Sequence, residues 1–312
     1  METFRNLESL RRIDQSVLTM GSFDGLHRGH QEIIKRVVSF SEARNLPSAT
    51  ITFDPHPRHI LDSKKHKLPL LMNLEHKLKL LDELRMDIVL VIPFTKDFSR
   101  ITAVKFMDQV VVKSFKPEHI TIGYDHHFGH GREGSSSFLK TYCESNKIGL
   151  EIVDPVSDEG LVISSTNIRN LIQSGFVRRA SFELGWVYGF QAKVVHGMGR
   201  GRKLFYPTAN FIPIEMNQLL PKNGVYLTRG RVDGQQLYGM CNLGVRPTFE
   251  EGEFVMEVHF FDPGIENFYG RQFLIEFLER IRDEKKFNTQ DELIEQLRYD
   301  ENICRELQRK YS

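Results

Sequence analysis

The apolar and polar positions of this chain follow two different patterns, one in each half. Residues 17–184 alternate short β-rich apolar runs with stretches in which apolar residues recur at helical spacing. This order predicts an α/β fold in which crossover helices connect the strands of a parallel sheet. The predicted strands are residues 17–20, 49–53, 88–92, 119–122 and 150–153. One helix is expected to begin near Asn73, a suitable N-cap, because Leu74, Leu78 and Leu81 make one apolar face.

After Leu184 the pattern changes to strand-like segments with few helical stretches. These segments cover residues 192–196, 224–232, 237–243, 254–261 and 273–279. The pair Asp233-Gly234 separates two alternating runs and is a strong hairpin signal. Several antiparallel strands in a short stretch predict a small barrel or a sandwich. A closing helix is expected from Thr289, which forms a capping-box pattern with Glu292.

Composition and charge limit the classes of protein. The length of 312 residues predicts about two domains, and 40% hydrophobic with 27% charged residues is typical of a globular protein. The formal net charge of +1 gives no argument for a polybasic surface, although it leaves room for a local basic patch, so neither nucleic acid nor a membrane is an expected partner. The N-terminus has acidic residues and no apolar core segment, and no later run is long enough to span a bilayer, which predicts a cytoplasmic location. Self-association into a homo-oligomer stays open.

The three cysteines do not form a pattern typical of disulfides or of a metal site. Cys143, Cys241 and Cys304 are odd in number, far apart and without a Cys-x-x-Cys pair. This spacing indicates neither a disulfide scaffold nor a thiolate metal site.

The most informative stretch is residues 20–30, which read M-G-S-F-D-G-L-H-R-G-H. The stretch follows an apolar run and leads into a helical pattern, so it predicts a strand, a glycine-rich turn and a helix. Its glycines are expected to allow positive φ and close approach of an anion to the helix amides: Gly21, Gly25 and Gly29. His27 and His30 are three apart, so both imidazoles can point at one phosphate. A plain turn is the alternative, and Gly-x-x-x-Gly alone would favour it.

Three loops follow the carboxyl ends of predicted strands. They are the glycine-rich turn, residues 52–57 with the sequence T-F-D-P-H-P, and residues 123–125 with the sequence G-Y-D. Ligands of open α/β sheets collect outside these ends, so the three loops are expected to converge on one crevice.

The segment S-S-T-N-I-R at residues 164–169 opens another helix. Hydroxyls and free amides at a helix N-terminus bind phosphate oxygens, and Arg169 can neutralise a leaving pyrophosphate. Alone, Ser165 or Thr166 is more simply an N-cap and Arg169 a solvated charge. Together with the glycine-rich turn, the segment describes imidazoles and an arginine around a polyphosphate without an obvious nucleophile. Such a site suits direct in-line transfer of a nucleotidyl group.

These motifs resemble the nucleotidyltransferase superfamily marked by His-x-Gly-His. Residues 52–57, the sequence G-Y-D-H-H-F-G at 123–129 and the second half narrow the resemblance to bacterial bifunctional riboflavin kinase/FAD synthetases, over nearly all 312 residues. The resemblance implies that residues 1–184 form a Rossmann-like domain that transfers AMP from ATP to FMN, giving FAD and pyrophosphate. The residues it implies for ATP are Gly21, Phe23, Asp24, His27, His30, Ser165, Thr166 and Arg169, with His27, His30 and Arg169 also catalytic. Those it implies for the flavin are His56, Asp125 and Phe128.

Residues 185–312 resemble the riboflavin kinase module, which implies a small antiparallel β-barrel followed by a C-terminal helix. The matching segments are G-R-K-L at 201–204, P-T-A-N at 207–210, N-L-G-V-R-P-T at 242–248 and E-V-H at 257–259. Thr208 and Asn210 lie two apart on one side of an extended strand, and their neutral oxygens suit Mg²⁺ shared with ATP phosphates. Glu257 matches the general base that accepts a proton from riboflavin; without the resemblance it would be a solvated strand carboxylate. A loop over the ATP phosphates is implied at Gly197, Gly199 and Gly201.

Two positions depart from the family pattern. Phe205 stands where a small residue is usual, which predicts strain if that position needs positive φ. His126 replaces a common Phe and forms a cluster with His127 and His130, which lacks the carboxylate or cysteine of an obvious metal site.

The sequence is compatible with three functions. The first is a bifunctional enzyme that makes FMN and then FAD from riboflavin, using ATP with Mg²⁺ twice. The second is an FMN adenylyltransferase whose kinase module is impaired, for which Phe205 is the motivating feature. The third is a flavin-binding regulatory protein without turnover. An enzyme is favoured because a pure binder needs no general base and because four residues are intact: His27, His30, Arg169 and Glu257.

Overall fold

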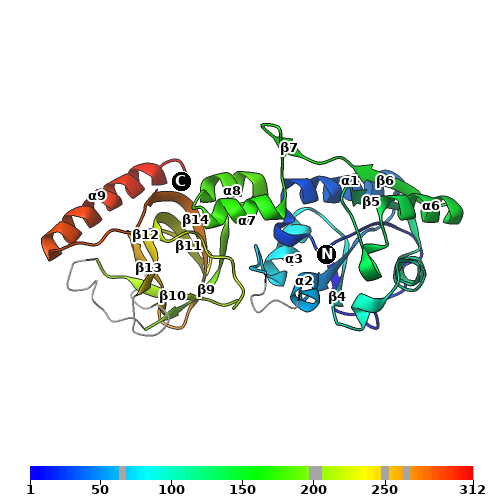
Figure 1. The fold of residues 1–312 in the computed structure, drawn as a ribbon, viewed down its shortest axis with the longest axis horizontal. Helices are drawn as coiled ribbons and strands as arrows, with labels where there is room; N and C mark the ends of the chain where they lie inside the picture. The colour runs from blue at the N-terminus through cyan, green and yellow to red at the C-terminus, as the bar shows by residue number, and fades with distance from the viewer. Residues whose placement is uncertain (63–67, 197–205, 247–252, 263–267, 312) are drawn as a thin grey trace. The chain divides into compact units, whose positions relative to one another are not determined.

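Figure 1 shows the chain as a computed structural model, which describes residues 1–62, 68–196, 206–246, 253–262 and 268–311. The chain divides into two compact units, Met1–Ser165 and Thr166–Ser312. Among the described residues, no helix combines the length and the apolar character needed to cross a bilayer.

The first unit is built on a six-stranded sheet with the order β1-β4-β3-β2-β5-β6. All neighbouring strands run parallel. The strands are β1 (Glu2–Phe4), β2 (Ser16–Met20), β3 (Ser48–Asp54), β4 (Ile88–Pro93), β5 (Pro117–Gly123) and β6 (Gly149–Val153). The predicted parallel α/β fold is confirmed, and each of the five predicted strands lies within one of β2 to β6. The short polar strand β1 has no apolar run and was not predicted.

Helices connect these strands and cover the sheet. They are α1 (Arg28–Arg44), α2 (Pro57–Leu61), α3 (Leu74–Glu83), α4 (Ala103–Phe106), α5 (Lys113–Phe115) and α6 (Ser136–Asn146). Short 3-10 turns form η1 (Asp24–Leu26), η2 (Phe98–Arg100) and η4 (His130–Arg132), and a π-helical segment forms η3 (Met107–Val112). The small hairpin β7 (Ser157–Asp158) and β8 (Leu161–Val162) follows β6. The predicted N-cap of α3 is confirmed, because the Asn73 side chain accepts the amide of His76 at 2.9 Å.

The central strands explain why this half reads as continuous apolar runs. Every residue of β2 is buried, since helices cover both faces of a parallel sheet. Leu18, Ile51, Leu90 and Ile120 come from four adjacent strands and belong to one core cluster.

The second unit contains a closed antiparallel barrel with the order β10-β13-β12-β11-β14-β9. Its strands are β9 (Gly189–Val195), β10 (Ala209–Pro213), β11 (Gly224–Val232), β12 (Gln235–Arg246), β13 (Glu253–Phe260) and β14 (Gln272–Arg282). Two helices precede the barrel, α7 (Ser165–Gln173) and α8 (Val177–Leu184), and α9 (Gln290–Gln308) follows it. Of the two predicted alternatives, a barrel and a sandwich, the structure has the barrel. The predicted hairpin is present, and Asp233 and Gly234 take positive φ of 46° and 79°.

The C-terminal helix closes one side of the barrel. Thr289 Oγ1 accepts the amide of Glu292 at 3.2 Å, which confirms the predicted N-cap. Cys304 of α9 is fully buried in a cluster with Val225 and Leu227 of β11. The last helix thereby covers apolar residues that the barrel would otherwise expose.

Candidate active sites

The glycine-rich turn connects β2 to α1 through backbone conformations that few residues tolerate. Within η1 and its flanks, Phe23, Gly25 and Leu26 have φ of 45°, 77° and 36°. Of the glycines expected at positive φ, only Gly25 is found there, so this expectation is wrong for Gly21 and Gly29. The unusual conformations fall instead on Phe23 and Leu26, which strains the turn.

Gly21 and Gly29 instead leave space for neighbouring side chains. A Cβ on Gly21 would lie 3.2 Å from the ring of Phe23, and one on Gly29 would lie 3.3 Å from the ring of His27. Both glycines therefore let an aromatic ring lie against the backbone of the turn.

The two histidines of the turn are stacked. His27 is the N-cap of α1, His30 lies in its first turn, and their ring centroids are 3.7 Å apart at 19°. Within the part of the chain that the structure describes, the Nδ1 atoms of both are buried without a hydrogen-bond partner. Burial lowers the pKa of His27 to about 4 and holds the pKa of His30 well below 6.5. Both imidazoles are therefore neutral at pH 7.

Two further loops meet the turn at Asp24. Its carboxylate lies 4.0 Å from His56 Nε2, which belongs to the loop after β3. Its backbone carbonyl accepts a hydrogen bond from Ser165 Oγ at 2.8 Å. Burial lowers the pKa of His56 to about 4, so this imidazole is also neutral at pH 7. Segments that are far apart in the sequence thus come together at the carboxyl ends of β2 and β3.

The loop after β5 carries Asp125 and Phe128. Asp125 is exposed, whereas Phe128 is half-buried and packs on Phe106 and Phe138 with ring centroids 5.4 and 5.9 Å apart. Because β5 pairs with β2, this loop emerges at the same edge of the sheet as the glycine-rich turn.

Among the described residues, no group of three or more His, Cys, Asp or Glu side chains is placed to hold a metal ion. Burial lowers the pKa of His126 to about 4.

Sequence reasoning missed Lys77, a buried residue of α3. Its Nζ donates to the Ser22 carbonyl at 2.6 Å and to Thr52 Oγ1 at 3.2 Å. A signal was present, because Lys77 follows Leu74 by three residues and so lies on the apolar face of the helix. A lysine in an apolar stripe is unusual and indicates a charge with a specific purpose.

Thr166 and Arg169 of α7 belong to the second unit. Thr166 is exposed, but Arg169 is only 8% exposed. Burial lowers the pKa of this guanidinium to about 10. The alternative of a solvated surface charge at Arg169 is therefore wrong.

A second polar group lies on the outer surface of the barrel. In the strand register, Glu257 of β13 faces Asn210 of β10 on one side and Asn242 of β12 on the other. Directly opposite residues of antiparallel strands project to the same face, with Cβ atoms about 5 Å apart. Met256 and Val258 on either side of Glu257 are buried, so Glu257 projects away from the barrel core. A carboxylate and two amides therefore lie side by side across three strands.

Thr208 lies just before β10 and is half-buried. It precedes Asn210 by two residues, and the neighbouring Pro207 carbonyl is 2.9 Å from His259 Nδ1. The hydroxyl of Thr208 and the amide oxygen of Asn210 are hard oxygen ligands of the kind that Mg²⁺ prefers, so these two residues would suit that ion. The expected phosphate loop at Gly197, Gly199 and Gly201, and the divergent Phe205, lie outside the described residues.

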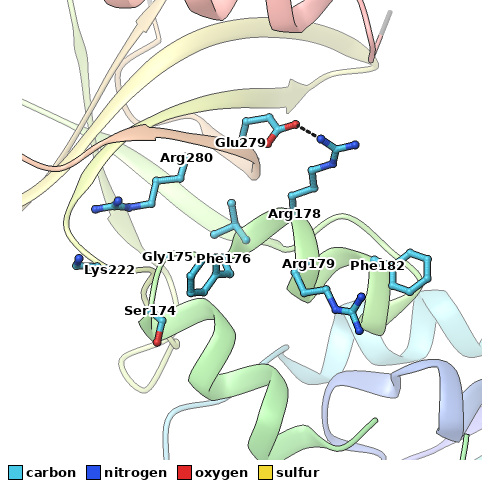
Figure 2. A pocket seen from close by; sticks show the side chains of 10 residues that line it. Ser174, Gly175, Phe176, Arg178, Arg179, Phe182, Lys222, Glu279 and Arg280 are labelled. Atoms are coloured by element: carbon cyan, nitrogen blue, oxygen red, sulfur yellow. Dashed lines mark hydrogen bonds and ion pairs between the residues drawn. The ribbon is translucent and has the colours of Figure 1, made fainter. Parts of the chain in front are cut away.

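The second unit also has a pocket of about 720 Å³ beside α8 and the end of β14 (Figure 2). Its cations form ion pairs with carboxylates. Arg178 lies 3.0 Å from Glu279, and Lys222 and Arg280 lie 3.1 and 2.7 Å from Asp283. Because these cations are already paired, we assign no phosphate site to this pocket.

Comparison with protein families assigns different enzymes to the two parts of the chain. The family described as FAD synthetase matches residues 10–167, and the family described as riboflavin kinase matches residues 184–308. The fold and the two matches together define a two-domain enzyme of flavin nucleotide synthesis.

Relatives that match nearly the whole chain have names that combine the same two activities. The bifunctional riboflavin kinase/FMN adenylyltransferase of Bacillus subtilis (strain 168) is 35% identical over 291 residues, which are 92% of this chain and 90% of that protein. The enzyme of the same name from Listeria monocytogenes is 36% identical over 290 residues, 93% of this chain and 91% of its own. The chain belongs to the family of bifunctional riboflavin kinase/FMN adenylyltransferases.

A solved structure shares the fold of the whole chain. The crystal structure of a macrolide-efflux protein from Streptococcus pneumoniae has a TM-score of 0.88 at 31% identity, and the match covers 97% of this chain and 98% of that chain. The name macrolide-efflux protein belongs to that structure, and only the similarity of fold is used for this chain.

Proposed function

We propose that this chain carries out its two reactions at two separate sites. The FAD synthetase and riboflavin kinase domains make it a riboflavin kinase and an FMN adenylyltransferase, with ATP as the co-substrate of both reactions. One observation carries the proposal of separate sites. Neutral imidazoles at a strained turn and a carboxylate between two amides are chemically different groups, and they belong to two different compact units.

The adenylyl-transfer site is assigned to the glycine-rich turn and the start of α7. In this reaction a phosphate oxygen of FMN attacks the α-phosphorus of ATP, the bond to the α–β bridging oxygen breaks, and pyrophosphate leaves. No proton has to move at phosphorus, so His27 and His30 act as hydrogen-bond donors to phosphate oxygens rather than as acid and base. Arg169 neutralises charge on the leaving group. The other ATP contacts are assigned to Gly21, Phe23, Asp24, Ser165 and Thr166.

The flavin of this reaction is assigned to the neighbouring loops. His56 and Asp125 are proposed to lie beside FMN, and Phe128 offers an aromatic edge to the ring system. Support comes from the strand order, since β3 and β5 flank β2 and their loops emerge on both sides of the turn.

The kinase site is assigned to the outer face of the barrel. Glu257 accepts the proton of the riboflavin primary hydroxyl as that oxygen attacks the γ-phosphorus of ATP and ADP leaves. Thr208 and Asn210 are proposed to hold Mg²⁺ together with ATP phosphates, and Gly197, Gly199 and Gly201 to cover these phosphates. When bound, Mg²⁺ would neutralise phosphate charge.

We also propose a functional boundary at residues 184 and 185, so that 1–184 is the adenylyltransferase domain and 185–312 the kinase domain. The start of the riboflavin kinase match at residue 184 supports this boundary.

Reciprocal substitutions test the separation of the sites. Glu257→Gln removes the general base, so riboflavin phosphorylation is expected to fall by about 10²–10⁴-fold while FMN adenylylation stays near normal. His30→Ala is expected to do the reverse, because it removes a phosphate donor from the other site. Chromatography of flavins after incubation with ATP and Mg²⁺ measures both activities in each variant. If Glu257→Gln stops both reactions in a folded protein, the assignment is wrong.

A further inference from the structure

Lys77 carries a buried positive charge at the point where three elements of the first unit meet. The residue is 7% exposed and comes from α3. Its Nζ contacts two neutral oxygens, the Ser22 carbonyl of the glycine-rich turn at 2.6 Å and Thr52 Oγ1 of β3 at 3.2 Å. Burying an ammonium group in this way is costly unless an anion comes to it.

The charged and titratable groups around Lys77 come from each neighbouring element. They are His30 of α1, His56 at the start of α2 and Asp54 at the end of β3, with Asp24 of η1 lying 4.0 Å from His56. Burial lowers the pKa of Lys77 to about 8, while Asp54 acts in the opposite direction. Burial is the main cause of the low pKa of His30 and His56, and the charge of Lys77 lowers both further. At pH 7 the imidazoles are therefore neutral and Lys77 is mostly protonated.

We propose that Lys77 is a positioning residue for ATP in adenylyl transfer. Its ammonium group donates hydrogen bonds to both Ser22 of the turn and Thr52 of β3. It also places a positive charge near the neutral histidines, where it attracts the triphosphate of ATP. This inference rests on the proposed adenylyl-transfer site. A purely structural lysine would need the two hydrogen bonds but not the charge, and this difference can be measured.

The first test removes the charge and keeps the length of the side chain. Lys77→Met is expected to lower kcat/KM for ATP in FMN adenylylation by about 10- to 100-fold, because two charge-assisted hydrogen bonds are lost. Riboflavin phosphorylation by the same chain is expected to stay within about twofold and serves as the internal control for folding. Lys79→Met is the matched control, since Lys79 lies on the same helix with a side chain that is 69% exposed.

The second test measures how adenylylation depends on the protonation of Lys77. The pH profile of kcat/KM reports groups of the free enzyme, so adenylylation by the unsubstituted protein is expected to fall as the pH rises through about 8, where Lys77 loses its proton. Lys77→Arg keeps a cation that does not titrate in this range. This variant is expected to be more active than Lys77→Met and to lose the fall near pH 8.

Each outcome decides the inference. Unchanged adenylylation in Lys77→Met overturns the inference. It is also overturned if the activity of the unsubstituted protein does not fall near pH 8, or if Lys77→Arg shows the same fall. If Lys77→Met loses both activities because it does not fold, the pH profiles decide. His30→Ala separates this inference from the proposal beneath it. If His30→Ala abolishes adenylylation and Lys77→Met does not, only the role of Lys77 is wrong, whereas normal adenylylation in both variants contradicts the site.

Discussion

At the residue scale, the first site is built from groups that are held against their intrinsic preferences. Phe23 and Leu26 adopt positive φ, which costs a residue with a Cβ about 1–2 kcal/mol. Both side chains are buried, at 3% and 0% exposure, and burial of a large apolar side chain contributes about 1.5–3 kcal/mol. Packing therefore offsets the strain, and the turn keeps a shape that local preference alone would not give.

Gly25 allows a separate test of this turn. Gly25→Ala is expected to lower the free energy of unfolding by about 1–2 kcal/mol, because its φ of 77° disfavours a Cβ, and to reduce FMN adenylylation by distorting the turn. Gly160→Ala is the matched control, since Gly160 has a φ of 80° in the β7–β8 turn and a Cβ there would meet no atom within 4 Å. Urea unfolding followed by circular dichroism measures the cost in each variant. Equal adenylylation by the two variants would contradict a role of the turn geometry.

At the element scale, an ion pair fixes the last helix to the barrel. Asp300 of α9 is 0% exposed, and both of its oxygens accept hydrogen bonds from Arg282 of β14 at 2.7–3.0 Å. Gln296 donates to the same carboxylate at 2.8 Å. A buried ion pair is a weak source of net stability, but removing one partner leaves a charge without compensation.

Removing one partner of this pair is expected to destabilise the protein more than removing both. Asp300→Leu removes the carboxylate that Arg282 binds, and it is expected to cost about 1–3 kcal/mol of unfolding free energy, because the Arg282 side chain is 20% exposed and still donates to the Asp283 carbonyl. The double variant Arg282→Met, Asp300→Leu is expected to recover most of this loss, because no unpaired charge remains. The single tryptophan of the chain, Trp186, reports unfolding of the second unit by its fluorescence. A double variant that is as unstable as Asp300→Leu would show that packing, and not charge, holds the helix.

At the scale of the whole molecule, local patterns predicted the elements, and contacts between distant segments decided the sites. The strands of the sheet were predictable because buried parallel strands are continuous apolar runs. The line of Asn210, Glu257 and Asn242 was not, because it depends on the register of three strands that are distant in sequence. The role of Lys77 was also hidden, since its partners Ser22 and Thr52 lie 55 and 25 residues away. Motifs thus identified the chemistry, and the fold supplied the neighbours.

Two sites on one chain imply that each can work when the other is inactive. A mixture of the Glu257→Gln and His30→Ala proteins tests this directly when riboflavin, ATP and Mg²⁺ are supplied and the flavins are separated by chromatography. Alone, Glu257→Gln is expected to leave riboflavin unconverted, and His30→Ala is expected to stop at FMN. Together they are expected to form FAD, because FMN released by one protein is adenylylated by the other. A mixture that leaves riboflavin unconverted or stops at FMN would contradict two independent sites.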